Sequence, residues 1–286
     1  CVARRGLARW ARSFAAGTSS TPPVPETMSY LRNLRNGDEV YLVGTAHISR
    51  KSADEVRNVI RSVRPDTVFL ELCDARAAAM RRSMSGNSDE GGIPEPLRQL
   101  LSALGAPGDL GEKMLGAGLK TVYNMFRMSG MDPGKEFKVG IEESDRIGAR
   151  LVLGDRSQEL TIRALRDAIT LPDILRMITG GGSMQWRDVD PQLVERFKRV
   201  DWNDPESAVE LLKTREAVRA LTRQMRREFP RVASAMLDQR DDHMTDGLLN
   251  KCSGRTVAVV GMAHMDGIES RWRDAMGGDG GVTLIS

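Results

Sequence analysis

The chain has 286 residues, of which 40% are hydrophobic and 28% are charged, a balance typical of a globular protein. Its formal net charge of +3 is too small to indicate a nucleic-acid partner, and no Lys/Arg block is interleaved with aromatic residues. The three cysteines lack C-x-x-C spacing, and no run approaches the ~20 apolar residues that span a bilayer, which argues against cysteine zinc sites, disulfide frameworks and membrane spans.

The first 27 residues differ from the rest of the chain. They carry four arginines and no acidic residue before Glu26, and serines and threonines follow the arginines. This composition is typical of a mitochondrial or plastid transit segment, and a disordered basic tail is the alternative. We therefore expect a leader over residues 1–27 and a single domain over residues 28–286, in mitochondria or plastids if the segment is a transit peptide and in the cytoplasm otherwise.

Strand and helix signals alternate at the start of the domain. Residues 40–43 form a short apolar run that is consistent with a buried strand. Apolar residues at helical spacing predict a helix over residues 52–63, with Ser52 as N-cap and Glu55 completing a capping box. Residues 67–72 predict a second strand. This succession favours parallel strands joined by a right-handed crossover.

The remainder of the chain continues the alternation after an interruption. Residues 85–118 are rich in Gly and Pro, which predicts a flexible insert around one or two short helices. Later segments predict a helix over 138–149, a strand over 150–153, a mainly helical stretch over 158–250, a strand over 257–260 and a short strand over 282–285. We therefore predict an α/β fold, with a central, mainly parallel sheet flanked by helices and an added mostly helical segment.

Polar residues follow each of the four main apolar strands. In chain order they are Gly44-Thr45-Ala46-His47, then Glu71 with Arg76, then Gly154-Asp155-Arg156, and finally Gly261-Met262-Ala263-His264. In open α/β sheets, ligands bind beyond the carboxyl ends of the strands, so these groups are expected at one edge. Gly44 and Gly261 are expected to let the backbone bend and approach its neighbours closely.

Two of the three histidines occupy the same frame, an apolar strand followed by Gly-x-Ala-His. Imidazole is the commonest metal ligand in proteins. Two histidines and one carboxylate form a familiar hydrolytic metal set, which leaves a position open for water. This pattern favours a shared site in which His47, His264 and Glu71 are ligands. The alternative is that both histidines only cap strand–helix turns.

Other charged residues near these strand ends have two interpretations each. Arg76 and Arg156 are suited to hold a substrate carboxylate or a developing oxyanion, and Asp155 is suited to orient a ligand histidine. The simpler alternatives are a salt bridge between Glu71 and Arg76, and a helix cap with an ion pair at Asp155-Arg156.

A second polar cluster surrounds Arg240 and Asp241 in a predicted helix. Leu237, Met244 and Leu248 lie on the predicted core side of that helix. A solvated charged face is the simplest interpretation. If the face turns inward instead, Arg240 or Asp241 reaches the strand-end crevice. His243 is expected to be exposed.

Several blocks of the chain resemble the TraB family. They are residues 40–49, 64–73 with Arg76, 142–143 with 151–156 and 160–163, 240–241 with Met244, and 259–268, in the expected order. This family is grouped with PrgY-type proteins, GumN and the Tiki proteins. Of these, the Tiki proteins are metal-dependent proteases with paired Gly-x-x-His motifs. One departure is Gln239, where the family usually has Glu.

The resemblance implies an α/β fold with added helices and a metal-dependent, peptidase-like hydrolase. A divalent Mn, Co or Zn ion would be held by His47 and His264, with Glu71 as ligand or general base. The expected catalytic residues are Glu71, Arg76, Arg156 and Arg240, and the residues expected to support the ligands are Asp155, Asp241, Gly44 and Gly261. A peptide or protein is the expected substrate.

A non-catalytic role is the alternative function. Eukaryotic TraB-domain proteins are linked with mitochondria and organelle contacts, which agrees with the basic leader. Such a module would bind a peptide, a peripheral membrane or an organelle-contact partner and keep the polar cluster as a scaffold. The leader and the Gly/Pro-rich insert over residues 85–118 motivate this second hypothesis.

Overall fold

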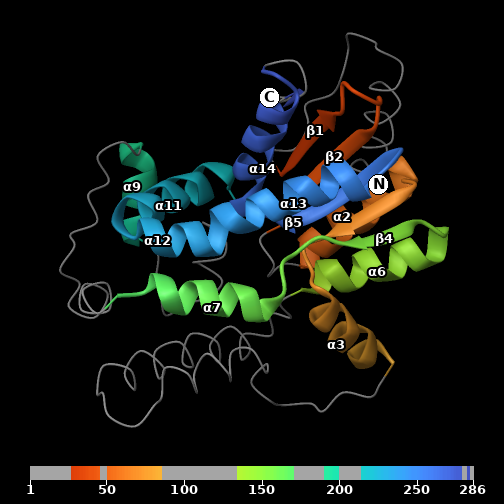
Figure 1. Ribbon diagram of the computed structural model, residues 1–286, viewed down its shortest axis with the longest axis horizontal. Helices are drawn as coiled ribbons and strands as arrows, with labels where there is room; N and C mark the ends of the chain where they lie inside the picture. Colours follow the sequence, from red (N-terminus) through yellow and green to blue (C-terminus); the bar gives the residue numbers. More distant parts are fainter. Residues whose placement is uncertain are drawn as a thin grey trace.

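Six strands form one sheet in the part of the chain that the structure describes, and Figure 1 shows helices packed around this sheet. The computed structural model describes residues 27–45, 50–85, 134–170, 190–199, 214–278 and 282–283. The strands are β1 (Met28–Arg32), β2 (Glu39–Thr45), β3 (Thr67–Leu70), β4 (Arg150–Leu153), β5 (Arg255–Gly261) and β6 (Val282–Thr283). They lie side by side in the order β4-β3-β5-β2-β1-β6.

Four of these strands, β2 to β5, run parallel to one another. The other two are antiparallel to their neighbours: β1 pairs with β2, and β6 pairs with β1. The predicted α/β fold with a mainly parallel sheet is therefore confirmed. Two details differ from the prediction. The first two predicted strands, β2 and β3, are parallel but not adjacent because β5 lies between them, and the sequence did not predict β1.

Helices cover both faces of this sheet. Their bounds are α2 (Arg50–Val63), α3 (Asp74–Met84), α6 (Lys135–Ile147), α7 (Gln158–Ala168), α9 (Pro191–Arg199), α11 (Arg215–Glu228), α12 (Pro230–Ala233), the π-helix η1 (Ser234–Asp238), α13 (Gln239–Lys251) and α14 (Met262–Ala275). Strand side chains alternate between faces. Val257 and Val259 of β5 join the core cluster of α2 and α6, whereas Ala258 and Val260 join that of α13 and α14.

The start of α2 corrects one local prediction. This helix begins at Arg50, so Ser52 lies inside it and the predicted capping box is wrong. Glu55 instead accepts a hydrogen bond from Thr27 Oγ1 at 2.5 Å. The contact ties the first turns of α2 to the chain just before β1.

Buried Glu143 on α6 holds α2 in place. Its carboxylate accepts from Arg61 Nη2 at 2.6 Å and lies 2.6 Å from Arg146 Nη2. Burial acts to raise the pKa of Glu143, but the hydrogen bonds and charges of Arg61 and Arg146 outweigh it and lower the pKa. A carboxyl whose pKa is lowered in the fold stabilises that fold above its ordinary value of 4.5, and the gain disappears as pH falls through the lowered value.

Replacing Glu143 with Gln is therefore expected to destabilise the protein in a pH-dependent way. The arginines are about half exposed, so screening limits the loss to about 1 kcal/mol at neutral pH. Urea unfolding of both proteins should give a difference that shrinks as the pH falls below the ordinary carboxyl pKa of 4.5. A difference that stays constant as the pH falls would show that the charge of Glu143 is not the cause.

Two predicted segments lie almost entirely outside the described residues. They are the leader over residues 1–27 and the insert over residues 85–118, and they stay predictions. The same holds for the division of the chain into a leader and one domain. Within the described ranges, no helix has the length and apolar character needed to cross a membrane.

Candidate functional site

The two Gly-x-Ala-His motifs begin side by side at the carboxyl edge of the sheet. Strands β2 and β5 are parallel neighbours, and their last residues pair as Thr45 with Gly261. Gly44 permits β2 to approach α14 closely, because a Cβ there would lie 2.1 Å from Sδ of Met265. His47 lies outside the described residues.

Glu71 occupies the same edge, directly after β3. Its backbone N–H donates to Val259 O at 3.0 Å, which continues the pairing of β3 with β5. The side chain is buried. Its Oε2 accepts from the N–H of Gly261 at 2.6 Å, and its Oε1 lies 3.3 Å from Nε2 of His264. One carboxylate therefore contacts the turn and the histidine of the second motif.

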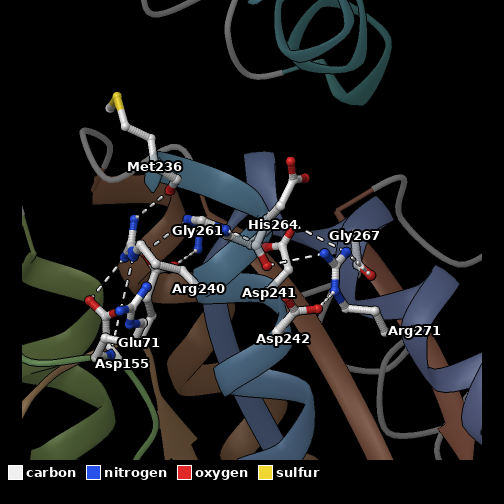
Figure 2. A network of polar contacts seen from close by, with 12 residues as sticks. Glu71, Asp155, Met236, Arg240, Asp241, Asp242, Gly261, His264, Gly267 and Arg271 are labelled. Atoms are coloured by element: carbon white, nitrogen blue, oxygen red, sulfur yellow. Dashed lines mark hydrogen bonds and ion pairs between the residues drawn. The ribbon is translucent and has the colours of Figure 1, made fainter. Parts of the chain in front are cut away.

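Arg240 of α13 links Glu71 to Asp155 (Figure 2). Its Nε and Nη2 each donate to the Asp155 carboxylate at 2.9 Å, and Nη2 also donates to Glu71 Oε1. Burial acts to lower the pKa of Arg240, but the charges of Glu71 and Asp155 raise it above its ordinary value. The predicted alternative partner of Glu71 was Arg76, but the structure gives Glu71 a partner from α13.

His264, in the first turn of α14, lies between two carboxylates. Its Nδ1 donates to Asp241 Oδ1 at 2.6 Å, and its Nε2 faces Glu71 (Figure 2). Burial acts to lower the pKa of His264, but the charge of Glu71 and the hydrogen bond to Asp241 raise it to about 9. The ring orientation is thus fixed through one nitrogen, while the other points toward the edge of the sheet.

Asp241 is fully buried, so the interpretation of this helix face as solvated is wrong. Burial raises the pKa of Asp241, against the opposing effect of its hydrogen bond to His264. Its Oδ2 has no hydrogen bond to any of the described residues, although Arg271 and Arg226 lie 3.7 and 3.9 Å away. We refer to Glu71, Asp155, Arg240, Asp241 and His264 as the His264 network.

The π-helix η1 directly precedes the network residues of α13. Its carbonyl groups accept from arginine side chains, Met236 O from Arg240 Nη1 at 3.4 Å and Asp238 O from Arg271 Nη2 at 3.1 Å. π-Helical turns are rare and occur often at functional sites. In this chain the π-helical turn comes just before Arg240 and Asp241, two consecutive residues whose side chains contact Glu71 and His264 at the carboxyl edge of the sheet.

The other residues considered in the sequence analysis, Arg156, Arg76 and His243, do not belong to the His264 network. Arg156 lies next to the network, where its Nη1 donates to Gln239 Oε1 at 2.6 Å, so the residue that departs from the family pattern has a polar partner. Arg76 has a cation–π contact on α6, with Cζ 5.9 Å from the ring centroid of Phe137. His243 is half-buried rather than exposed, and burial lowers its pKa.

A separate polar cluster around Arg215, which was not predicted from the sequence, ties α11 to α14 and β1. Arg215 Nη2 donates to Asp266 and to buried Glu269 at 2.6 Å each, and Arg215 Nη1 donates to Ser29 Oγ at 3.2 Å. The charged residues recur at helical spacing, Arg215 with Arg219 and Asp266 with Glu269. That spacing was the signal available in the sequence. The cluster fixes α14, the helix that carries His264.

The donor chemistry fits a divalent metal in part. A metal-ligating histidine usually has its second nitrogen bonded to a carboxylate, as His264 has with Asp241. Glu71 supplies a second donor, although Arg240 already pairs with it. The described residues contain no group of three His, Cys, Asp or Glu side chains that could hold a metal. The third predicted ligand, His47, lies outside them.

Known proteins resemble this chain over most of its length. The model of the TraB/PrgY/gumN family matches residues 31–274. TraB domain-containing proteins of Bos taurus and Homo sapiens are each 28% identical over 279 aligned residues, which cover 88% of this chain and 67% of theirs. An uncharacterized protein of Methanocaldococcus jannaschii is 27% identical over 237 residues, covering 82% of this chain and 53% of its own. The family match includes the whole His264 network.

Proposed function

The chain belongs to the TraB/PrgY/gumN family, and from this premise we propose that it is a metal-dependent, peptidase-like hydrolase centred on the His264 network. The observation that carries the proposal is a buried histidine between two carboxylates, Asp241 on Nδ1 and Glu71 facing Nε2. Buried polar groups with perturbed pKa values at the carboxyl edge of an α/β sheet are typical of catalytic sites.

Each residue of the network has a defined task in this proposal. Asp241 holds the ring of His264 in one orientation through Nδ1. Arg240 pairs with the buried carboxylate of Glu71, and Glu71 acts as the general base that accepts a proton from an attacking water. Arg240 and Arg156 carry positive charge beside this position, which stabilises negative charge that develops on a substrate carbonyl oxygen.

In this proposal His47 and His264 would hold the metal, with Glu71 either as a further ligand or as the general base. When bound, a divalent Mn, Co or Zn ion lowers the pKa of a coordinated water and polarises the scissile carbonyl. The partial positive charge at the start of α14 and the N–H of Gly261 also favour the negatively charged carboxylate of Glu71 where it lies.

The activity test compares the wild type with His264→Ala in an assay of a diverse peptide mixture by mass spectrometry, in the presence of Mn, Co or Zn. We expect cleavage by the wild type and a loss of at least about 100-fold in the variant, because acid–base and electrostatic groups each contribute at this scale. Arg163→Ala on the exposed side of α7 is the matched control and should retain its rate. Equal rates for all three proteins would contradict a catalytic role for His264.

The alternative is a non-catalytic binding or organelle-contact module. It is motivated by the mitochondrial-type leader over residues 1–27 and the insert over residues 85–118, nearly all of which lie outside the described residues. In that case the His264 network is a scaffold. A wild type that cleaves no peptide of the mixture, but whose partner complex survives replacement of His264, would favour this alternative.

A further inference from the structure

Strand β4 is one of the two edge strands of the sheet in the described part of the chain, the other being β6. Its Arg150 N–H donates to Asp66 O at 3.0 Å, and the N–H of Gly154, just after the strand, donates to Leu70 O at 2.9 Å. Both bonds are directed toward β3. Because backbone groups alternate in direction along a strand, the N–H and C=O groups of Leu151 and Leu153 point away from β3, toward the outer edge.

A groove of about 780 Å³ runs along this outer edge. It is lined by the whole of β4, by Asn250 to Ser253 at the carboxyl end of α13, and by Asp74 at the start of α3. Its volume is within the ~300–1,000 Å³ range of ligand sites. A groove between an edge strand and a helix is the geometry in which PDZ domains bind an extended peptide as an added strand.

The groove leads toward the His264 network. At its carboxyl end, β4 continues into Gly154 and Asp155, and Asp155 pairs with Arg240. The groove is also charged differently at its two ends. Arg150 and Lys251 lie at the amino end of β4, where Arg150 Nη2 donates to Lys251 O, whereas Asp74 lies at the other end. All three side chains are exposed.

We propose that β4 binds the substrate, an extended peptide that adds to the sheet as a further strand in the groove between β4 and α13. About four of its residues pair with β4 at ~3.3 Å per residue, through the outward backbone groups of Leu151 and Leu153. An acidic side chain lies beside Lys251 and a basic one beside Asp74. The inference rests on the proposed peptidase function and names its substrate class and binding mode.

The direction in which the peptide pairs with β4 is expected from the general stability of β-strand pairs. Antiparallel pairing is slightly more stable than parallel pairing, so the peptide is expected to run opposite to β4. Its basic residue then lies toward its own amino end, near Asp74, and its acidic residue toward its carboxyl end, near Lys251. An acetylated and amidated hexapeptide with Lys first, Glu last and a Thr-Val-Thr-Val centre has this order, and its blocked ends add no charge.

Binding is measured by titrating this peptide into the protein. A second peptide, in which Lys and Glu are exchanged, is titrated in the same way, and the two dissociation constants are compared. We expect the exchanged peptide to bind about tenfold more weakly, because two surface ion pairs become two like-charge contacts. In the double variant Asp74→Lys/Lys251→Glu the preference should reverse. Arg163→Glu, exposed on α7 and not among the residues that line the groove, should leave it unchanged. An unaltered preference in the double variant would overturn the proposed charge recognition.

Amide hydrogen exchange by NMR tests the backbone pairing directly. With bound peptide, exchange of the Leu151 and Leu153 amides should slow by about tenfold or more, whereas that of Arg150, already bonded to Asp66, should change little. Mass spectrometry before and after the titration shows whether the probe stays intact. Protection without cleavage would support this inference even if the hydrolase proposal fails. Cleavage without protection at Leu151 and Leu153 would overturn the inference and leave the hydrolase proposal standing.

Discussion

Replacement of Arg240 by Ala is expected to lower the free energy of unfolding by about 3–5 kcal/mol. The Arg240 side chain is only 16% exposed and pairs with the carboxylates of Glu71 and Asp155, whose side chains are 5% and 7% exposed. Removing it leaves two buried negative charges without their main cation, and either charge must then be neutralised or rehydrated at a cost in stability. Urea unfolding monitored by circular dichroism gives the loss directly.

Two comparisons separate this effect from a general loss of surface charge. Arg163→Ala removes an exposed arginine of α7 and should change the unfolding free energy by less than about 0.5 kcal/mol. Arg240→Lys keeps one positive charge but not the planar fork that reaches Asp155 through two nitrogens, so an intermediate loss is expected. If Arg240→Ala is no more destabilising than Arg163→Ala, the ion pairs of Arg240 do not hold this edge of the sheet together.

Gly267→Ala is expected to destabilise the protein by about 2 kcal/mol, although Gly→Ala inside a helix normally stabilises by roughly 0.5–1 kcal/mol. The sign changes because a Cβ at Gly267 would lie 1.9 Å from Asp241 Oδ2. The Asp241 carboxylate must move, and its hydrogen bond to His264 weakens. Thermal unfolding should show the loss, and peptide cleavage should fall together with it.

A double-mutant cycle identifies the cause of that loss. In an Asp241→Ala background the carboxylate is absent, so the added methyl group at Gly267 meets no obstacle there. Gly267→Ala should then be neutral or slightly stabilising, which gives a coupling energy of about 2 kcal/mol between the two positions. Additive effects of the two changes would show that contact with Asp241 is not what excludes a side chain at Gly267.

Most of the fold is predictable because its main strands are short apolar runs that end at glycine or at a charged residue. Residues 40–43, 67–72, 150–153 and 257–260 all correspond to strands of the parallel sheet. Strand β1 was missed because its five residues, Met28–Arg32, mix polar and apolar side chains, and its stability comes from antiparallel pairing with β2. Such pairing depends on contacts that a local pattern does not contain.

A site residue is predictable from the sequence only where the order and direction of the strands determine its place in the fold. Glu71, Asp155 and His264 follow neighbouring parallel strands, so their convergence follows from the carboxyl-edge rule. Arg240 and Asp241 lie on a helix, and which face of that helix is buried depends on its packing and on the π-helical turn before it. Arg76 is five residues from Glu71, yet its cation–π partner is Phe137 on α6. Sequence proximity therefore suggested the wrong arginine partner for Glu71.

Metal content of the purified protein tests the central claim, that the two Gly-x-Ala-His motifs form one hydrolytic metal centre. After incubation with Mn, Co or Zn and removal of free ions, elemental analysis should give about one tightly bound metal per chain for the wild type. It should give far less for both His47→Ala and His264→Ala, since each removes one of the two proposed histidine ligands. Metal content that is unchanged in both variants would contradict a shared metal centre.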